Sequence, residues 1–519
     1  MKKVRIFLTG LLMTMAVALG GCTGDKTAET PVSSAENADG SGYSATGQIT
    51  IGIAQDLDDG LDPHKVDAAG TREILFNVYE GLVKYDVNGN LVPAVASDYA
   101  ISTDGLTYTF TLREGVLFHD GNAVTPDDVI YSLSRCADTS NGEALKPALT
   151  NISFLQANDE GKVVIKLNEP DPDFLSYMTT AIIPAWNTDP ETNVVGTGPY
   201  KFVSHTPQES VVLEAFDEYW GEKAHIKNVT LKVIANPDSI VMEMMGGSVD
   251  MFCRVTDEQA KELATGDFNI ETGTMNLVQA LYLNNSYEPF QDERVRQAIC
   301  YAIDPDEVMA YVSGGEGTEI ATAVFPAFGR YYDASLNDNY NKDVEKAKEL
   351  LKEAGYENSL EFSITVPSNY QPHVATAEVL VEQLKAAGIN ASIELVDWDT
   401  WLSGTYSERN YQATVIGVDA NPLTARALLE RYRSDAGNNF MNYNNPDFDA
   451  KLDAAFATYD DEEQTKLFKE CLSILSETAA SAYIQDLPCF VAVRKNVAGY
   501  KFYPLYAQDF ASLYFTDAQ

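Results

Sequence analysis

The chain has 519 residues, and its 36 Lys and Arg against 77 Asp and Glu give a formal net charge of −41. This acidity excludes a nucleic-acid binder, which needs a basic face to replace the counterions of phosphate. With 45% hydrophobic and 22% charged residues, the composition is that of a globular protein. At roughly 100–200 residues per domain, we expect two or three domains.

The N-terminus has the pattern of an export signal that ends in a lipid anchor. Basic residues among the first five precede an apolar stretch, residues 6–19, which is shorter than the ~20 residues that span a bilayer. It leads into Leu-Gly-Gly-Cys, which resembles the lipobox of bacterial lipoproteins. Ordinary cleavage, with Cys22 incidental, is the alternative. We predict a signal peptide over residues 1–21, a diacylglycerol on Cys22, and a lipid-anchored position on the extracytoplasmic face of a membrane.

The segment that follows cannot build a core. Residues 22–47 are mostly Ser, Thr, Gly, Ala and acidic residues, which predicts a flexible tether. Five cysteines remain beyond Cys22, so at least one thiol per monomer is unpaired. Separately, we expect the protein to be a monomer. Because no C-x-x-C occurs, buried small side chains are a better interpretation than a zinc or redox site. These cysteines are Cys136, Cys253, Cys300, Cys471 and Cys489.

Common catalytic motifs do not occur in the sequence. It has no H-E-x-x-H, no G-x-S-x-G, no Walker-type phosphate loop and no G-x-G-x-x-G after a strand. The five His residues are isolated from one another, which disfavours a metal site. We therefore expect no enzymatic activity, no cofactor and no metal. An extracellular hydrolase would require a constellation that converges only in space.

Two halves of the chain differ in periodicity. The first is rich in strand-like alternation, at residues 49–53, 107–112, 163–167, 211–215 and 230–234. The second contains helical spacing after Asp343, ending near Gly355, then a strand at 362–366, a helix at 374–387 stopped by Gly388, and a strand from 393. This is a βαβ unit with parallel strands. A further strand at 412–418 and helices at about 447–458 and 462–477 complete an α/β domain.

Short blocks along residues 48–519 resemble the family 5 extracellular solute-binding proteins, the peptide, opine and nickel receptors of ABC transporters. The blocks are 61–64 (LDPH), 79–83 (YEGLV), 112–121 (LREGVLFHDG), 125–129 (TPDDV), 196–201 (GTGPYK), 219–221 (YWG), 294–298 (RVRQA), 302–304 (AID) and 444–449 (NNPDFD). Most have a structural interpretation first. The glycines and proline of 196–199 form a turn into a strand, and Phe118, Val129 and Leu133 are predicted core residues.

The resemblance implies an α/β, two-lobed periplasmic-binding-protein-like fold of type II, with three subdomains and the ligand held between the lobes. The first lobe would comprise residues 48–275 plus 487–519, with an inserted subdomain at about 88–194. The second would comprise residues 276–486. The lobes would close on the ligand by a hinge motion without performing chemistry.

Asp419 is the leading candidate ligand residue. It follows the apolar strand at 412–418, and ligands of open α/β sheets gather at the carboxyl ends of strands. In peptide-binding relatives an Asp at this point pairs with the peptide's amino group, and Asp419 is the matching residue. A surface turn or helix cap is the alternative. Dipeptide receptors also carry an Arg after the strand equivalent to 361–366, whereas this chain has PSNYQP at 367–372, which favours longer peptides.

Further candidates come from the resemblance. Relatives place an aromatic residue at the position of Trp398 against the ligand, where a flat ring gives a large contact area. Core packing is the alternative for Trp398 and the better interpretation of Trp401. Tyr79 and Glu80 belong to a family block near the expected ligand.

These features together predict a substrate-binding lipoprotein of an ABC importer, which captures peptides and delivers them to a membrane permease with cytosolic ATPases. The same fold could instead bind an oligosaccharide, an opine or a metal chelate. A signalling receptor is also compatible with the sequence.

Overall fold

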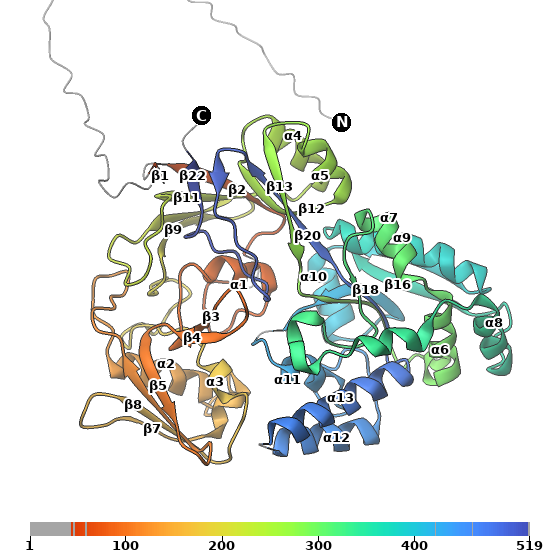
Figure 1. The fold of residues 1–519 in the computed structure, drawn as a ribbon, viewed down its shortest axis with the longest axis horizontal. Helices are drawn as coiled ribbons and strands as arrows, with labels where there is room; N and C mark the ends of the chain where they lie inside the picture. Colours follow the sequence, from red (N-terminus) through yellow and green to blue (C-terminus); the bar gives the residue numbers. More distant parts are fainter. Residues whose placement is uncertain (1–42, 45–46, 58–59, 421, 459, 517–519) are drawn as a thin grey trace, which may run out of the picture. The chain divides into compact units, whose positions relative to one another are not determined.

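A computed structural model describes residues 43–44, 47–57, 60–420, 422–458 and 460–516. The predicted signal peptide, Cys22 and most of the predicted tether lie outside the described residues. The described residues form one compact unit, whose larger sheets have seven, six and four strands (Figure 1). Among the described residues, no helix combines the length and apolarity needed to cross a membrane.

The seven-stranded sheet forms the centre of the first lobe, in the order β13-β20-β12-β2-β11-β10-β9. Its strands are β2 Gln48–Ile53, β9 Tyr200–Thr206, β10 Ser210–Ala215, β11 Asn228–Val233, β12 Met251–Val255, β13 Phe268–Thr274 and β20 Pro488–Arg494. β2 is parallel to β11 and β12, and the other neighbours are antiparallel. Ile49 and Ile51, whose alternation predicts a strand, are fully buried in one core cluster.

A four-stranded antiparallel sheet belongs to the same lobe, in the order β5-β6-β8-β7. Its strands are β5 Ala96–Ile101, β6 Thr107–Leu112, β7 Ile152–Ala157 and β8 Val163–Leu167, so the predictions at 107–112 and 163–167 are confirmed. Helix α2, Pro126–Ala137, begins at a capping box of Thr125 and Asp128 and packs on this sheet (Figure 1). Phe118, Val129 and Leu133 are buried there, as predicted.

Shorter elements complete the first lobe. Its helices are α1 Ala69–Leu75, α3 Phe174–Tyr177, α4 Ile240–Met245 and α5 Asp257–Leu263. Its short strands are β3 Val83–Tyr85, β4 Leu91–Pro93, β21 Val497–Ala498 and β22 Tyr514–Thr516, and β22 also pairs with β1, Tyr43–Ser44. Gly196 and Gly198 lie so close to the backbone of Asn77 and Val78 that a side chain would not fit, which explains both glycines of the family block before β9.

The six-stranded sheet forms the second lobe, in the order β15-β19-β14-β18-β16-β17. Its strands are β14 Val278–Leu283, β15 Thr318–Glu319, β16 Glu361–Pro367, β17 Asn390–Val396, β18 Ala413–Val418 and β19 Ala482–Asp486. β16 is parallel to both β17 and β18, which confirms the predicted βαβ unit. Its helix α9, Gln371–Ala386, starts three residues earlier than the predicted start, because Pro372 fits the first helical turn.

Helices cover both faces of this sheet. In β14, Leu281 and Leu283 point into one core cluster, and Ala280 and Tyr282 point into the other, so every residue of the strand is buried. The first cluster packs under α6 Glu293–Ala302, α7 Pro305–Ser313, α8 Val344–Glu353 and α9. The second packs under α11 Ala425–Leu429, α12 Pro446–Ala457 and α13 Asp461–Glu477. Asp343 caps α8 through its side chain, as its position predicts.

The described cysteines are all buried and free of disulfides. They lie in four of the hydrophobic clusters or beside them, which confirms that they act as small apolar side chains. Burial raises the pKa of the Cys136, Cys300 and Cys471 thiols to about 12, which leaves them protonated at neutral pH.

The chain crosses between the lobes twice, from β13 to β14 and back from β19 to β20. The two crossing segments are hydrogen-bonded to each other, because the Met275 N–H donates to the Leu487 carbonyl at 2.8 Å. Beside this bond, the buried Asp486 carboxylate accepts the N–H of Leu277 at 3.1 Å. Burial raises the pKa of Asp486 to about 7, against the opposing effect of the backbone N–H groups of Leu277 and Asn276.

We expect Asp486→Asn to stabilise the protein at alkaline pH relative to the wild type. In the folded protein the pKa of Asp486 lies above the ordinary Asp value of 3.8, so this group favours folding at low pH and its contribution is lost as pH rises through about 7. The difference between these two pKa values corresponds to an upper limit of roughly 4 kcal/mol in the free energy of unfolding. Thermal unfolding between pH 5 and pH 8 should show a difference that grows with pH. The exposed Asp98→Asn serves as the control, and a pH-independent difference for Asp486→Asn would contradict the prediction.

Candidate functional site

Asp419 lies at the carboxyl end of β18 and forms an ion pair with the first lobe. Its Oδ2 accepts a hydrogen bond from Nη2 of Arg72, which belongs to α1. Each side chain keeps 21% of its surface exposed. Nη1 of Arg72 donates to the backbone carbonyl of Asp67, in the segment before α1. The carboxylate that the sequence predicts for a ligand cation therefore holds a guanidinium from the opposite lobe.

A buried imidazole fixes the end of β18. The Gly417 N–H donates to Nε2 of His373 at 3.2 Å, and Nδ1 of the same ring is 2.8 Å from the side-chain amide of Gln279. Burial lowers the pKa of His373 to about 4, so the ring is neutral at neutral pH and can accept that bond. Gln279 is also 2.9 Å from the side-chain amide of Gln485 in β19. Hydrogen bonds thus connect the second crossing to the strand that carries Asp419.

The loop after Asp419 contacts the first lobe again. The Leu423 N–H donates to the Tyr85 hydroxyl at 3.0 Å. A Cβ added to Gly89 would lie 3.1 Å from the Leu423 side chain and 2.9 Å from Pro504, so the close approach depends on glycine at a positive φ of 79°. Sequence reasoning missed Tyr85 and Gly89, because their partner is more than three hundred positions away.

A second set of ion pairs joins the lobes through α11. The Arg426 Nε lies 3.3 Å from Asp173, its Nη2 lies 3.8 Å from Asp171, and its guanidinium stacks 3.6 Å from the Phe456 ring centroid. Burial raises the pKa of Asp173 to about 6, although Arg426 acts in the opposite direction. The lobes are therefore in direct contact at several points.

The two predicted tryptophans lie side by side but in different environments. Trp401 is 4% exposed, belongs to a core cluster, and donates from Nε1 to the Thr414 hydroxyl at 3.0 Å. Trp398 is half-buried and stacks on Trp401 at 5.2 Å, with Tyr370 against it at 5.4 Å. The Tyr370 hydroxyl donates to Gln55 of the first lobe at 2.8 Å. Trp398 therefore lies beside a contact between the lobes, whereas Trp401 supports it from the core.

Tyr79 and Glu80 lie within the first lobe. Glu80 is 7% exposed and accepts hydrogen bonds from the Tyr219 hydroxyl and Trp220 Nε1, both at 2.7 Å, and from Lys84 at 3.1 Å. Tyr79 is 7% exposed and packs in the core beside the seven-stranded sheet. Among the described residues neither forms a hydrogen bond or ion pair with Asp419, and their role as ligand residues stays a prediction.

From its hydrogen bonds we expect Glu80→Gln to reduce stability by about 1–3 kcal/mol. The amide replaces an acceptor oxygen with a donor that faces other donors, which leaves buried polar groups unpaired. Urea unfolding gives the stability, and titration with a bound ligand gives the affinity. Glu114→Gln, at an exposed position, is the control. A loss of affinity at unchanged stability would instead support a ligand role for Glu80.

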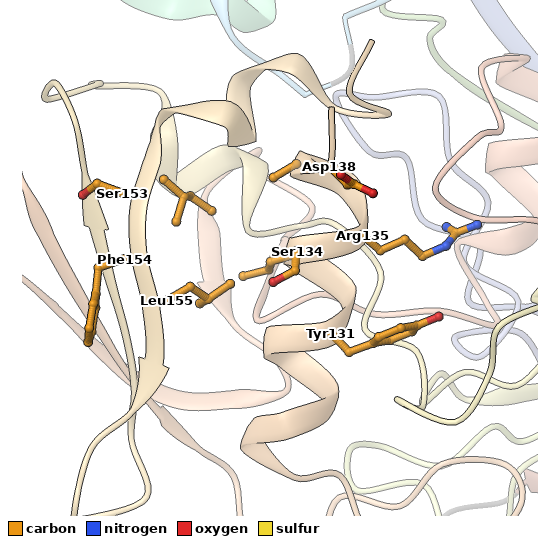
Figure 2. Close-up of a pocket in the computed structure, with 10 residues that line it drawn as sticks. Tyr131, Ser134, Arg135, Asp138, Ser153, Phe154 and Leu155 are labelled. Atoms are coloured by element: carbon orange, nitrogen blue, oxygen red, sulfur yellow. The ribbon is translucent and has the colours of Figure 1, made fainter. Parts of the chain in front are cut away.

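A hollow of about 630 Å³ lies away from these contacts, between α2 and β7. Figure 2 shows Arg135 and Tyr131 extending from α2 away from the β7 residues Ser153, Phe154 and Leu155. Arg135 binds the Asp62 carboxylate at 2.5 Å, and the Tyr131 hydroxyl donates to the Asn187 carbonyl at 2.9 Å. Because Arg135, which lines the hollow, is already paired with Asp62 of the same lobe, this hollow is not the candidate site. Within the described residues, no cluster of His, Cys, Asp and Glu is arranged to hold a metal ion.

Comparison with known proteins identifies the fold and the family. The model of the bacterial extracellular solute-binding proteins, family 5, matches residues 90–440, and the chain belongs to this family. The oligopeptide-binding protein AppA of Bacillus subtilis is 25% identical, with 97% of each chain covered.

Solved structures agree. The periplasmic binding protein DppA of Helicobacter pylori, in complex with the peptide STSA, is 25% identical with a TM-score of 0.80, covering 91% of this chain and 98% of that one. AgaA of A. tumefaciens, in complex with agropinic acid, is 27% identical with a TM-score of 0.79, covering 91% and 99%. The fold is thus a two-lobed α/β binding protein, as the family resemblance implies, and the family consists of solute-binding proteins rather than enzymes.

Proposed function

We propose that this protein is the extracytoplasmic receptor of an ABC importer and that it captures oligopeptides between its lobes. The observation that carries the proposal is the position of Asp419, a carboxylate at the carboxyl end of a central strand that already binds a cation from the opposite lobe. An ammonium group can bind such a carboxylate through a charge-assisted hydrogen bond. AppA and DppA, by their names and bound peptide, support a peptide as the ligand.

The lobes would act as two units around the crossings at Met275 and Leu487. We propose the boundaries that the sequence predicts, residues 48–275 plus 487–519 for the first lobe, with its subdomain at about 88–194, and residues 276–486 for the second. Trp398 would contact the bound chain, since its ring lies beside the contact of Tyr370 with Gln55. Closure would present both lobes to a permease with cytosolic ATPases, which would import the peptide.

An opine is the second candidate ligand, because AgaA, at 27% identity, was solved with agropinic acid. A carboxylate-rich ligand would interact with Arg72 rather than with Asp419. Comparison of the two ligand classes on the same protein therefore decides between them.

Replacing Asp419 with Asn should weaken the binding of peptides with a free amino terminus by about tenfold or more, since a hydrogen bond to a charged group contributes ~1.5–3 kcal/mol. N-acetylated copies of the same peptides should bind both proteins alike. Calorimetric titration of protein stripped of carried-over ligand measures both affinities. Asp399→Asn, at an exposed position near Trp398, is the matched control. Equal losses for free and acetylated peptides would argue against an amine-binding role.

The lipid anchor is a separate part of the proposal. With Cys22→Ser, the thiol that would receive the diacylglycerol is lost, and we expect the protein to leave the membrane fraction because no other anchor is predicted. Fractionation of cells that express either form, followed by immunoblotting, measures the distribution. Cys136→Ser is the control, since this thiol is buried in the body of the protein. Retention of the Cys22→Ser protein on the membrane would contradict lipidation as the means of attachment.

A further inference from the structure

We propose that Arg72 is a built-in competitor for the ligand's amino group at Asp419 and that it selects peptides with an acidic side chain near their amino terminus. This inference rests on the proposed peptide-binding function, and it assigns a specificity role to a residue of the first lobe. It follows from how Arg72 is held and from what its neighbours leave available.

The pair of Arg72 with Asp419 is built to be exchanged. A guanidinium binds a carboxylate most strongly when two of its nitrogens face the two oxygens. Here Nη2 donates to Oδ2 of Asp419, but Nη1 donates to the carbonyl of Asp67 instead. Both side chains are also about one-fifth exposed, so solvent weakens their attraction. A ligand ammonium can therefore displace the guanidinium at a moderate cost.

The ion pair of Glu73, the next residue of the same helix, with Arg254 is one that a ligand would not readily exchange. Glu73 is 3% exposed and receives both terminal nitrogens of Arg254, with Nη1 at 2.9 Å from Oε1. The Arg254 guanidinium stacks on the Tyr506 ring at 4.1 Å. The Arg254 backbone has a positive φ of 63°, at a shift in the register between β12 and β20. Glu73 therefore cannot readily take over Arg72 when a ligand displaces it from Asp419.

A displaced Arg72 thus stays beside the ligand's amino terminus as a positive charge. A peptide that begins with Lys or Arg would place a second cation next to it, which is unfavourable. A peptide with Asp or Glu in its first or second position would offer it a carboxylate in exchange for Asp419. The binding step then replaces one ion pair with two, so the number of paired charges rises. Selection at this end comes from repulsion as well as from attraction.

Affinities of matched tetrapeptides test the role of Arg72. The peptides begin with Glu, Ala or Lys, are otherwise alike, and are prepared with free and with acetylated amino termini. We expect the full-length wild-type protein to prefer the Glu peptide to the Lys peptide by roughly 5- to 20-fold, as one close charge contact at a partly exposed site allows. Arg72→Gln should bind the Ala and Lys peptides roughly 3- to 10-fold more tightly than wild type and lose the preference for Glu.

Two further variants separate charge from folding. Arg72→Lys keeps the positive charge and should keep the preference for the Glu peptide. Arg426→Gln also removes an ion pair between the lobes, but not at Asp419, and should leave the order of the three peptides unchanged. Thermal unfolding of each variant shows that it is folded.

The outcomes distinguish the two proposals. If peptides bind the wild type but Arg72→Gln weakens all of them equally, or leaves their order unchanged, the competitor role of Arg72 is wrong while the peptide receptor stands. If no free-amine peptide binds either the wild type or Arg72→Gln, the proposed function fails and this inference fails with it.

Discussion

The geometry of the candidate site depends on one neutral imidazole buried behind β18. His373 can accept the Gly417 N–H only while Nε2 carries no proton, and burial keeps the ring neutral by lowering its pKa. Through Gln279 the same ring is connected to Gln485, next to the buried carboxylate of Asp486. The strand that presents Asp419 and the second crossing therefore share one chain of hydrogen bonds. The second crossing lies at one end of this chain, and Asp419 follows the strand at the other.

The charged side chains described above divide into two kinds. Glu80 and Glu73 are almost fully buried and accept hydrogen bonds from several donors of their own lobe, so they stabilise the first lobe itself. Asp419 and Asp173 instead meet arginines of the other lobe, and these contacts exist only while the lobes are together. In the proposed receptor, opening of the lobes would have to break the interactions of the second kind.

Much of the architecture could be predicted from local sequence, because periodicity and capping act over a few residues. The strands at 107–112 and 163–167, the βαβ unit and the two helices before β19 follow from such patterns. Helix α2 went unpredicted although Thr125, Pro126 and Asp128 form a recognisable start. The position of Asp419 after β18 was also local. Its partner Arg72 was not, since 347 positions separate them and nothing near Arg72 in sequence indicates a carboxylate across the lobes.

The order of strands in the first lobe has a consequence for how the protein matures. β20 lies between β13 and β12, yet it is made after the whole six-stranded sheet of the second lobe. During synthesis from the N-terminus, all strands of the second lobe are made before the first lobe can complete its seven-stranded sheet. Until β20 arrives, β12 and β13 expose unpaired edges, which can pair with another chain. The late synthesis of β20 thus exposes the newly made protein to aggregation.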